Sequence, residues 1–309
     1  MRKAAEASIK VALEARGWGA ALCSLDALAD ALAELEGLRD EGRIAAEVYR
    51  RYLGGFDRAP PERLPKASSL LILAAPLGPS ILALQTEAGP FEAIIPPTYG
   101  IPELRSEAEA VFGPLLAAAG AGFTRARVPL KALAARAGLG RYGRDNILRR
   151  EGLGSYFRLE SWWTELEAEE GSWGPPEPLE SCASCGACAA ACPNGCLRPG
   201  NFVVDASRCT TFLNEGDGAF PGWLGAGAHD AAVGCLRCQG ACPENPRLTE
   251  LAPLRRIELD LRESESLFEG RLLPDSAACR AALAAAEMDD SPELLGRNLR
   301  ALRLARGAR

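Results

Sequence analysis

The stretch CASCGACAAACP, residues 182–193, contains three cysteines at intervals of three, a fourth cysteine four residues later and then a proline. This C-x2-C-x2-C-x3-C-P spacing is typical of segments that bind two [4Fe–4S] clusters, and its fourth cysteine binds a different cluster from the first three. A tight loop can wrap three thiolates around one cluster, and the helical turn after it carries the fourth thiolate away. The cysteines of this run are Cys182, Cys185, Cys188 and Cys192.

A second run, CLRCQGACP at residues 235–243, supplies C-x2-C-x3-C-P, and Cys209 lies alone between the two runs. Reciprocal pairing gives eight ligands for two clusters. Thiolates are soft, anionic ligands that suit iron–sulfur chemistry. The first predicted cluster takes Cys182, Cys185, Cys188 and Cys242, and the second takes Cys192, Cys209, Cys235 and Cys238. Cys196 is left without a role.

Two other interpretations of these cysteines are weaker. An all-thiolate zinc site needs only four ligands and usually has a shorter gap between its two C-x2-C pairs. A disulfide framework is disfavoured because the chain has 11 cysteines, an odd number, most of them crowded into one segment.

The composition is that of an ordinary globular protein, with 48% hydrophobic and 25% charged residues in a chain of 309. The first residues have the pattern of a charged amphipathic helix and lack the apolar core of a signal peptide. The longest apolar stretch, residues 67–84, is interrupted by prolines and a glycine, which predicts buried strands and a turn instead of a membrane span. We therefore expect a cytoplasmic protein without a membrane partner. A net charge of −6 argues against a nucleic acid held by charge alone.

The N-terminal half alternates predicted helices and strands. Helical periodicity at residues 4–15 and 26–52 frames a short strand at 20–24. Leu70–Ala75 is a continuous apolar run of the kind buried in the middle of a sheet. A strand at 91–95, a helix at 106–120 and a strand at 122–128 follow. This alternation of helices and strands predicts an α/β sandwich domain.

Residues 129–166 differ in composition from the segments before them and are rich in glycine and aromatic residues. Glycines at this density permit close approach of the backbone to a large flat ligand. The segment GLGRYG follows a predicted helix, so it does not fit the dinucleotide-binding fingerprint, which follows a strand. Simple loop closure is the alternative interpretation.

These segments together resemble the epoxyqueuosine reductase family, which is related to the reductive dehalogenases. The resemblance is carried by AARAGLGRYGRDNIL, GSYFRLESWWTELE, the two cysteine runs and, ahead of them, DRAPPERLPKASSLLILAAPL. It covers roughly residues 58–245, with a weaker match at GRNLRAL near the C-terminus. Members carry two [4Fe–4S] clusters and a cobalamin whose cobalt has no histidine ligand, and they perform two-electron reductions. The resemblance implies that the eight cysteines above are cluster ligands. The residues that it places near cobalamin are Arg58, Gly140, Tyr142, Gly143, Asn146, Ser155 and Tyr156.

The only histidine, His229, lacks the D-x-H-x-x-G pattern with which other corrinoid proteins bind cobalt. We expect it to be a hydrogen-bonding residue near the surface.

The chain departs from the family at the segment that supplies the acid. Epoxyqueuosine reductases have Asp-Tyr-His there, with the aspartate as proton donor, whereas this chain has Thr98-Tyr99-Gly100. Reductive dehalogenases use a tyrosine, so Tyr99 is the candidate catalytic acid. The alternative is a tyrosine that only packs on a turn.

The end of the chain predicts a helix that starts at Ser291-Pro292 and ends near Gly307. Longer family members continue into repeats that help to hold tRNA. The arginines spaced every three residues along this helix are expected to form a solvated face instead of an RNA-binding surface. They are Arg297, Arg300, Arg303 and Arg306.

We therefore predict an α/β (α+β) corrinoid-binding-type domain at residues 1–175, a ferredoxin-like domain with two [4Fe–4S] clusters at 176–250 and a helical tail at 251–309. The predicted function is an oxidoreductase that passes electrons from an external donor, such as a ferredoxin or flavodoxin, through two clusters to cobalamin and then to an unknown small-molecule substrate. One alternative is a genuine epoxyqueuosine reductase acting on tRNA. The others are an electron carrier or a corrinoid-binding or corrinoid-activating protein without substrate chemistry of its own.

Overall fold

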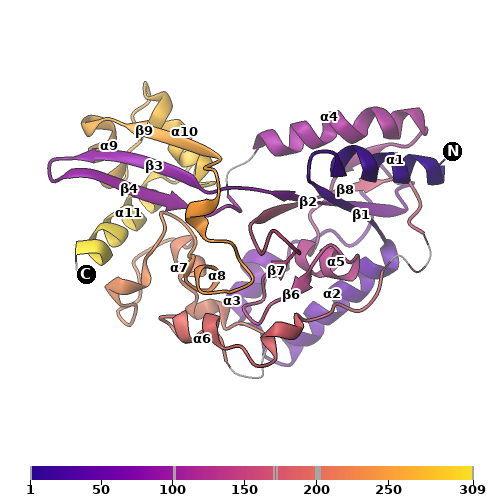
Figure 1. Cartoon of the computed structure of the whole chain (residues 1–309), viewed down its shortest axis with the longest axis horizontal. Helices are drawn as coiled ribbons and strands as arrows, with labels where there is room; N and C mark the ends of the chain where they lie inside the picture. The colour runs from indigo at the N-terminus through magenta and orange to yellow at the C-terminus, as the bar shows by residue number, and fades with distance from the viewer. Residues whose placement is uncertain (1, 100–101, 170, 172, 199–202, 308–309) are drawn as a thin grey trace. The chain divides into compact units, whose positions relative to one another are not determined.

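The computed structural model describes residues 2–99, 102–169, 171, 173–198 and 203–307 (Figure 1). The chain divides into two compact units, each built from two segments. Unit 1 comprises Met1–Pro76 and Ile101–Cys185, and unit 2 comprises Leu77–Gly100 and Gly186–Arg309. This division into two units does not test the three domain ranges predicted from the sequence, which stay a prediction. Among the described residues, no helix is both long and apolar enough to cross a bilayer.

Unit 1 is a helix–sheet–helix sandwich around a four-stranded sheet in the order β1-β2-β8-β5. All three strand pairs in it are antiparallel. The strands are β1 (Gly19–Ser24), β2 (Ser69–Pro76), β5 (Phe123–Arg125) and β8 (Phe157–Thr164). The helices are α1 (Arg2–Glu14), α2 (Leu25–Asp40), α3 (Ala46–Val48) with the π-helical turn Tyr49–Leu53, α4 (Pro102–Ala118) and α5 (Leu130–Arg136). The predicted α/β sandwich is thus confirmed at this coarse level.

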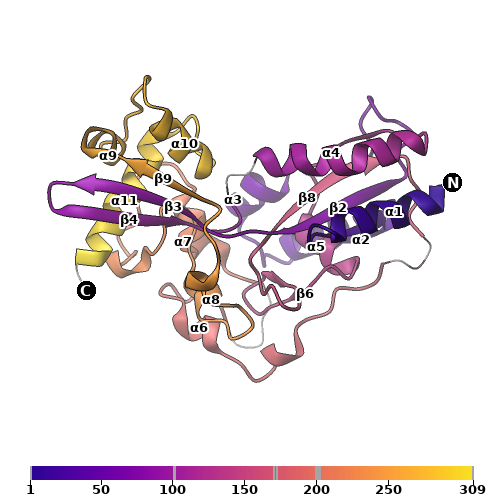
Figure 2. The same cartoon turned by 45° about the horizontal axis from the view of Figure 1, so that its top comes forward.

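Helices α1 and α4 lie together on one side of this sheet, and α2 and α5 lie on the other (Figures 1 and 2). The side-chain period of a strand is two, so the continuous apolar run of β2 serves both faces. Leu70 and Ile72 pack with α2 and α5 in one cluster of buried residues. On the α4 side, the buried Trp162 of β8 contacts Phe112 edge-on and donates a hydrogen bond from Nε1 to Glu109 at 2.8 Å.

A small hairpin of β6 (Arg141–Tyr142) and β7 (Leu148–Arg149) completes unit 1. It lies in the middle of the glycine-rich stretch and includes Gly143. Strand β8 pairs with β2 along the whole length of β2. It was not predicted from the sequence, because residues 129–166 were interpreted as one ligand-binding segment rich in glycine and aromatic residues.

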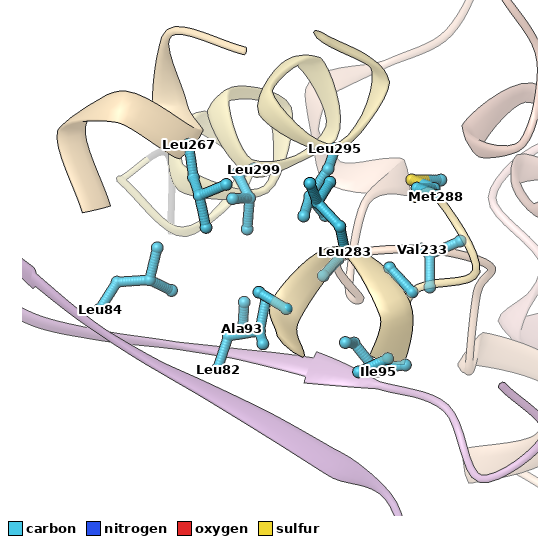
Figure 3. Packing of buried hydrophobic residues seen from close by; sticks show 14 of the residues in the cluster. Leu82, Leu84, Ala93, Ile95, Val233, Leu267, Leu283, Met288, Leu295 and Leu299 are labelled. Carbon is cyan, nitrogen blue, oxygen red and sulfur yellow. The ribbon is translucent and has the colours of Figure 1, made fainter. Parts of the chain in front are cut away.

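Unit 2 is built on a three-stranded sheet in the order β4-β3-β9. Its strands are β3 (Ser80–Thr86), β4 (Gly89–Ile95) and β9 (Arg255–Leu259), with β3 antiparallel to β4 and parallel to β9. Helices α9 (Leu261–Phe268), α10 (Ala277–Ala285) and α11 (Pro292–Gly307) form an apolar core with this sheet (Figure 3). The C-terminal helices are as expected, but β9 was not predicted.

The cysteine-rich part of the chain has only short elements. In unit 1 it begins with the 3-10 turn η2 (Glu180–Cys182). In unit 2 it contains α6 (Ala187–Ala191), η3 (Ala206–Arg208), α7 (Thr210–Asn214), η4 (Ala226–Ala228), α8 (Arg237–Gly240) and η5 (Leu248–Glu250). Helices α6 and α8, one from each cysteine run, pack against each other. Most described residues of the ferredoxin-like region therefore lie in loops between short helices.

Candidate iron–sulfur site

The predicted ligands are distributed over short helices and the loops at their ends. Cys182 and Cys185 are among the last residues of unit 1, and the other six lie in unit 2. Cys188 lies within α6, and Cys192 caps the C-terminal end of α6 with an extended backbone that the following proline favours. Cys238 lies within α8, and Cys209 immediately precedes α7.

Five of the sulfur-bearing side chains of unit 2 gather in one apolar cluster. Its buried members are Cys188, Cys196 and Leu197, against which Cys192, Cys209, Cys238, Ala189 and Val204 pack. Such an apolar shell around thiolates lowers the local dielectric and excludes water, both of which set the potential of an iron–sulfur cluster. The described residues contain no group of three Cys, His, Asp or Glu side chains placed to bind one metal ion.

The Cys192 and Cys209 sulfurs are surrounded by hydrogen-bond donors. The side chain of Cys196 lowers the pKa of Cys192 to about 5, and backbone N–H groups from Cys196, Asn194 and Gly195 add to the effect, against an opposing contribution from burial. The Cys196 side chain likewise lowers the pKa of Cys209 to about 6, with backbone donors from α7. These donors favour the thiolate, the form that binds iron.

Cys235 is in a different environment. Burial raises its pKa, and the nearby carboxylate of Asp230 raises it further. Asp230 itself accepts a hydrogen bond from the Leu236 N–H at 3.2 Å and lies 3.6 Å from Arg237 Nε. A bound metal supplies positive charge that deprotonates a coordinating thiol outright, so a cluster ligand at Cys235 would release a proton on binding.

Cys196 is the site residue that sequence reasoning left aside. It is 2% exposed and its thiol is within hydrogen-bonding reach of the sulfurs of both Cys192 and Cys209, contacts that raise its own pKa. The backbone N–H of Cys196 also donates to Cys192 Sγ at 3.4 Å. The signal that could have found it is its position four residues after a predicted ligand, across a Pro-Asn-Gly turn that reverses the chain.

Tyr99, the candidate acid, lies on the turn after β4 in unit 2. Its hydroxyl donates a hydrogen bond to the carboxylate of Glu215, which follows α7. The ring lies against Gly234, whose φ is +64°, and a Cβ there would be 2.8 Å from the tyrosine hydroxyl. Sequence reasoning found no carboxylate beside Tyr99, because Glu215 is distant in sequence. Gly100, the third residue of this segment, is outside the described residues.

The arginines of α11 divide into one half-buried anchor and an exposed row. Arg297 donates to the carbonyl oxygens of Leu213 at 2.8 Å and Gly216 at 2.7 Å and lies over the Phe220 ring at 4.1 Å. It therefore caps the C-terminal end of α7, and the expected solvated face is wrong at this position. The other three, Arg300, Arg303 and Arg306, are exposed as expected.

His229 is not near the surface, which corrects that expectation. It is 3% exposed and contacts the Phe220 ring with a centroid distance of 4.6 Å. Its Nδ1 is buried and has no hydrogen-bond partner among the residues that the structure describes. Burial, with the charge of Arg297 as a lesser cause, lowers the pKa of His229 to about 4, so the imidazole is neutral at pH 7.

In unit 1, two glycines predicted to lie near cobalamin face the protein's own side chains. Asp145 and Arg149 form a buried bidentate pair, with Nη1–Oδ1 and Nη2–Oδ2 distances of 2.6 and 2.7 Å. A Cβ on Gly143 would lie 2.1 Å from Arg149 Nη1, and a Cβ on Gly140 would lie 2.9 Å from the Arg149 carbonyl oxygen. The hairpin therefore requires glycine at these positions for its own packing.

The other predicted cobalamin residues also have internal partners. Tyr142 packs on the apolar cluster beneath α2 and α5, and burial raises its pKa. Asn146 has a φ of +60° and accepts hydrogen bonds from Lys131 Nζ at 2.9 Å through its backbone and side-chain oxygens. Arg58 is exposed and bonds Glu36. Ser155 and Tyr156 are both 2% exposed. Their placement near a cobalamin stays a prediction.

Comparison with known proteins agrees with the cysteine chemistry. Residues 181–245 match the family model described as a 4Fe-4S double cluster binding domain. An epoxyqueuosine reductase from Francisella cf. novicida is 31% identical over 142 residues, which are 46% of this chain and 37% of that protein. The Bacillus subtilis epoxyqueuosine reductase is 34% identical over 117 residues, 37% of this chain and 28% of the relative. The matched regions thus span about a third of the relatives' length.

Solved structures extend the likeness in fold. A selenomethionine-labelled epoxyqueuosine reductase superimposes with a TM-score of 0.67 at 20% identity, covering 98% of this chain and 82% of that one. An epoxyqueuosine reductase with an epoxyqueuosine-modified tRNA-Tyr stem loop gives 0.65 at 19% identity, with 98% and 81% coverage. The predicted resemblance is confirmed: the chain is similar to epoxyqueuosine reductases in fold and in part of its sequence, and residues 181–245 match a 4Fe-4S double cluster binding domain.

Proposed function

We propose that this protein is an iron–sulfur oxidoreductase that reduces epoxyqueuosine in tRNA. The observation that carries the redox part is the match of residues 181–245 to a double cluster domain, together with the gathering of thiols around Cys192 and Cys209. The sequence analysis placed an unknown substrate first. The comparisons favour the epoxyqueuosine alternative, because the relatives and structures described above are epoxyqueuosine reductases and one of them is bound to a modified tRNA stem loop.

The cluster ligands of the proposal are the eight cysteines in the predicted pairing. The residues around Cys192 and Cys209 of the second set fit a cluster, since several N–H groups point at sulfur and apolar side chains pack beside them. Two such clusters supply one-electron steps that connect an external donor to a two-electron reduction. A small ferredoxin or flavodoxin is the proposed donor.

Cobalamin is proposed from the family resemblance alone. The described contacts of Gly140, Gly143 and Tyr142 are all within unit 1. When bound, a cobalamin supplies a strongly reducing metal centre for two-electron chemistry. In that case Arg58, Asn146, Ser155 and Tyr156 complete the proposed set of contacts.

The proton that accompanies reduction is assigned to Tyr99 with Glu215 as its partner. Two-electron reduction of an epoxide consumes two protons, whichever carbon–oxygen bond is broken. A phenol beside a carboxyl group can deliver one of them, and the carboxyl group can relay a replacement proton that it takes up from solvent. The second proton also comes from solvent. Glu215 thereby provides the carboxylate that is missing from the Thr98-Tyr99 segment, and Gly234 leaves room for the ring.

The test begins with anaerobic purification of the whole chain with cobalamin supplied, followed by iron, sulfide and cobalt quantitation. The proposal expects about eight irons and one cobalt per chain. The reduced protein is then mixed with an epoxyqueuosine-modified tRNA stem loop, and the nucleosides are analysed by mass spectrometry. An unmodified stem loop of the same sequence is the control.

Loss of the epoxide signal from the modified stem loop with the reduced protein, and not with protein that has not been reduced, supports the proposal. Eight irons and one cobalt per chain without turnover of the modified stem loop would refute epoxyqueuosine as the substrate. Eight irons without cobalt, even after reconstitution, would leave an electron carrier and refute the cobalamin part. Replacing Tyr99 by Phe should reduce turnover while iron and cobalt contents stay unchanged.

A further inference from the structure

We infer that Cys196 is a positioning residue of the second cluster, whose thiol and backbone N–H donate hydrogen bonds to the ligand sulfurs of Cys192 and Cys209 and raise the reduction potential of that cluster. The inference rests on the proposed function, because it requires that this cluster be bound. It assigns a role to Cys196, the ninth cysteine of this region, which is not one of the eight predicted ligands.

The turn that follows α6 determines where Cys196 lies. Pro193 ends the helix, Gly195 adopts a φ of +62°, and the chain reverses so that the Cys196 N–H faces Cys192 Sγ at 3.4 Å. Glycine adopts this φ at no steric cost. The Cys196 side chain is thereby brought back beside the sulfur from which the turn started, and it reaches the Cys209 sulfur as well.

A second set of hydrogen bonds fixes this turn to the segment that carries the other ligand. Asn194 Nδ2 donates to the Arg208 carbonyl and to Thr210 Oγ1, both at 2.9 Å. These acceptors flank Cys209 in the sequence. The Asp205 N–H donates to the Cys196 carbonyl at 3.0 Å. Cys196 is therefore held between two predicted ligands of the same cluster by bonds that do not involve its own thiol.

The surroundings of Cys196 are suited to electrostatic tuning. The residue is 2% exposed and packs with Leu197 and Val204, so water does not compete for its thiol. A hydrogen bond in such a low-dielectric site is stronger than in water. Because a donor withdraws charge from the ligand sulfur, it stabilises the reduced cluster, which carries one more negative charge. The potential of the second cluster should therefore be higher with Cys196 than without it.

The experiment compares the whole chain with three variants, all purified anaerobically and analysed for iron. Cys196→Ala removes the thiol donor, and Cys196→Ser keeps a donor of similar size. Cys279→Ala is the matched control, because Cys279 is also a fully buried thiol of unit 2, but it contacts the Glu263 carbonyl and not a predicted ligand. The potentials of both clusters are measured by redox titration followed by electron paramagnetic resonance.

The expected result is full iron content in all four proteins and a lower potential for one cluster in Cys196→Ala. A tenfold loss in the equilibrium constant of reduction is a shift of 59 mV for one electron. Cys196→Ser should recover part of the shift, and Cys279→Ala should show none. Unchanged potentials in Cys196→Ala with full iron would overturn the inference while leaving the proposed function intact.

Two further outcomes also count against it. If Cys196→Ala and Cys196→Ser both lose about four irons, Cys196 is itself a ligand and not a hydrogen-bond donor. If the unmodified chain binds no iron after reconstitution, the proposed function fails first and the inference fails with it.

Discussion

Gly143 provides a direct test of whether the glycine-rich hairpin of unit 1 serves its own packing or a cofactor. In the structure, a Cβ at Gly143 would lie 2.1 Å from Arg149 Nη1 and 2.8 Å from Asp145 Oδ1. Gly143→Ala must therefore displace a guanidinium that is nearly fully buried with its carboxylate. Overpacking of this kind costs about 1–3 kcal/mol, and separation of a buried ion pair costs about 3–5 kcal/mol. We expect a loss of about 3 kcal/mol in the free energy of unfolding.

The matched control is Gly37→Ala in α2 of the same unit. Gly37 is within a helix, and a Cβ there meets nothing within 4 Å. Alanine is favoured over glycine inside a helix by about 0.5–1 kcal/mol, so this variant should be slightly more stable. The same chemical change thus has opposite expected signs at two positions of one unit.

The assay is thermal unfolding by far-ultraviolet circular dichroism, at one scan rate, without added cobalamin. A change of 1 kcal/mol shifts the midpoint by about 2–4 °C for a unit of this size. Gly143→Ala should melt about 6–12 °C lower and Gly37→Ala up to about 4 °C higher. The reasoning is refuted if Gly143→Ala melts with the unmodified chain. If that stable variant also failed to bind cobalamin, the glycine would serve the cofactor and not the ion pair.

Three shorter predictions concern unit 2. Arg297→Ala removes the donor to the carbonyls at the C-terminal end of α7 and should lower the melting temperature by several degrees. Arg303→Ala should leave the melting temperature nearly unchanged. Equal effects of the two substitutions would contradict the capping role of Arg297. The pKa of His229 is lowered in the folded protein to about 4, so below pH 6.5 the unfolded chain takes up a proton first, and the free energy of unfolding should fall by up to about 3 kcal/mol between pH 6.5 and 4. His229→Gln should flatten that part of the stability profile, and an unchanged profile would show that other groups determine it. Glu215→Gln should reduce turnover of the proposed substrate about as much as Tyr99→Phe does, with iron content unchanged; full activity in Glu215→Gln would remove the carboxylate from the proton path.

The sequence was sufficient to predict the features whose geometry is local. The spacing of the cysteine runs indicated the cluster domain, since two residues between successive ligands specify a tight loop. Helical periodicity indicated the longer helices of unit 1, and the Ser291-Pro292 cap indicated the start of α11, which begins at Pro292. The apolar run of β2 indicated an inner strand, and β2 does lie between two partners: it pairs with β8 along its whole length and with β1 from Ser69 to Ala74.

What the sequence did not indicate depends on contacts between distant segments. β9 pairs with β3, with Leu82 opposite Ile257, and no local pattern specifies such a partner. The same holds for Glu215 beside Tyr99 and for Arg297 at the end of α7. β8 was missed for another reason. Its aromatic residues Trp162 and Trp163 were included in the predicted ligand-binding segment. They are instead the largest fully buried side chains among the described residues.

The division of unit 2 into two chain segments has a consequence for synthesis on the ribosome. The β3–β4 hairpin is complete at Ile95, but its partner β9 begins only at Arg255, 160 residues later. At about 5–20 residues per second, the hairpin waits roughly 10–30 s for that strand. During this interval Leu82 and Leu84, both fully buried in the folded protein, have no core to enter. An apolar strand with an open edge is prone to pair with other chains. The nascent protein should therefore depend on a chaperone during this interval, and a chain that stops before β9 should aggregate even though unit 1 is complete.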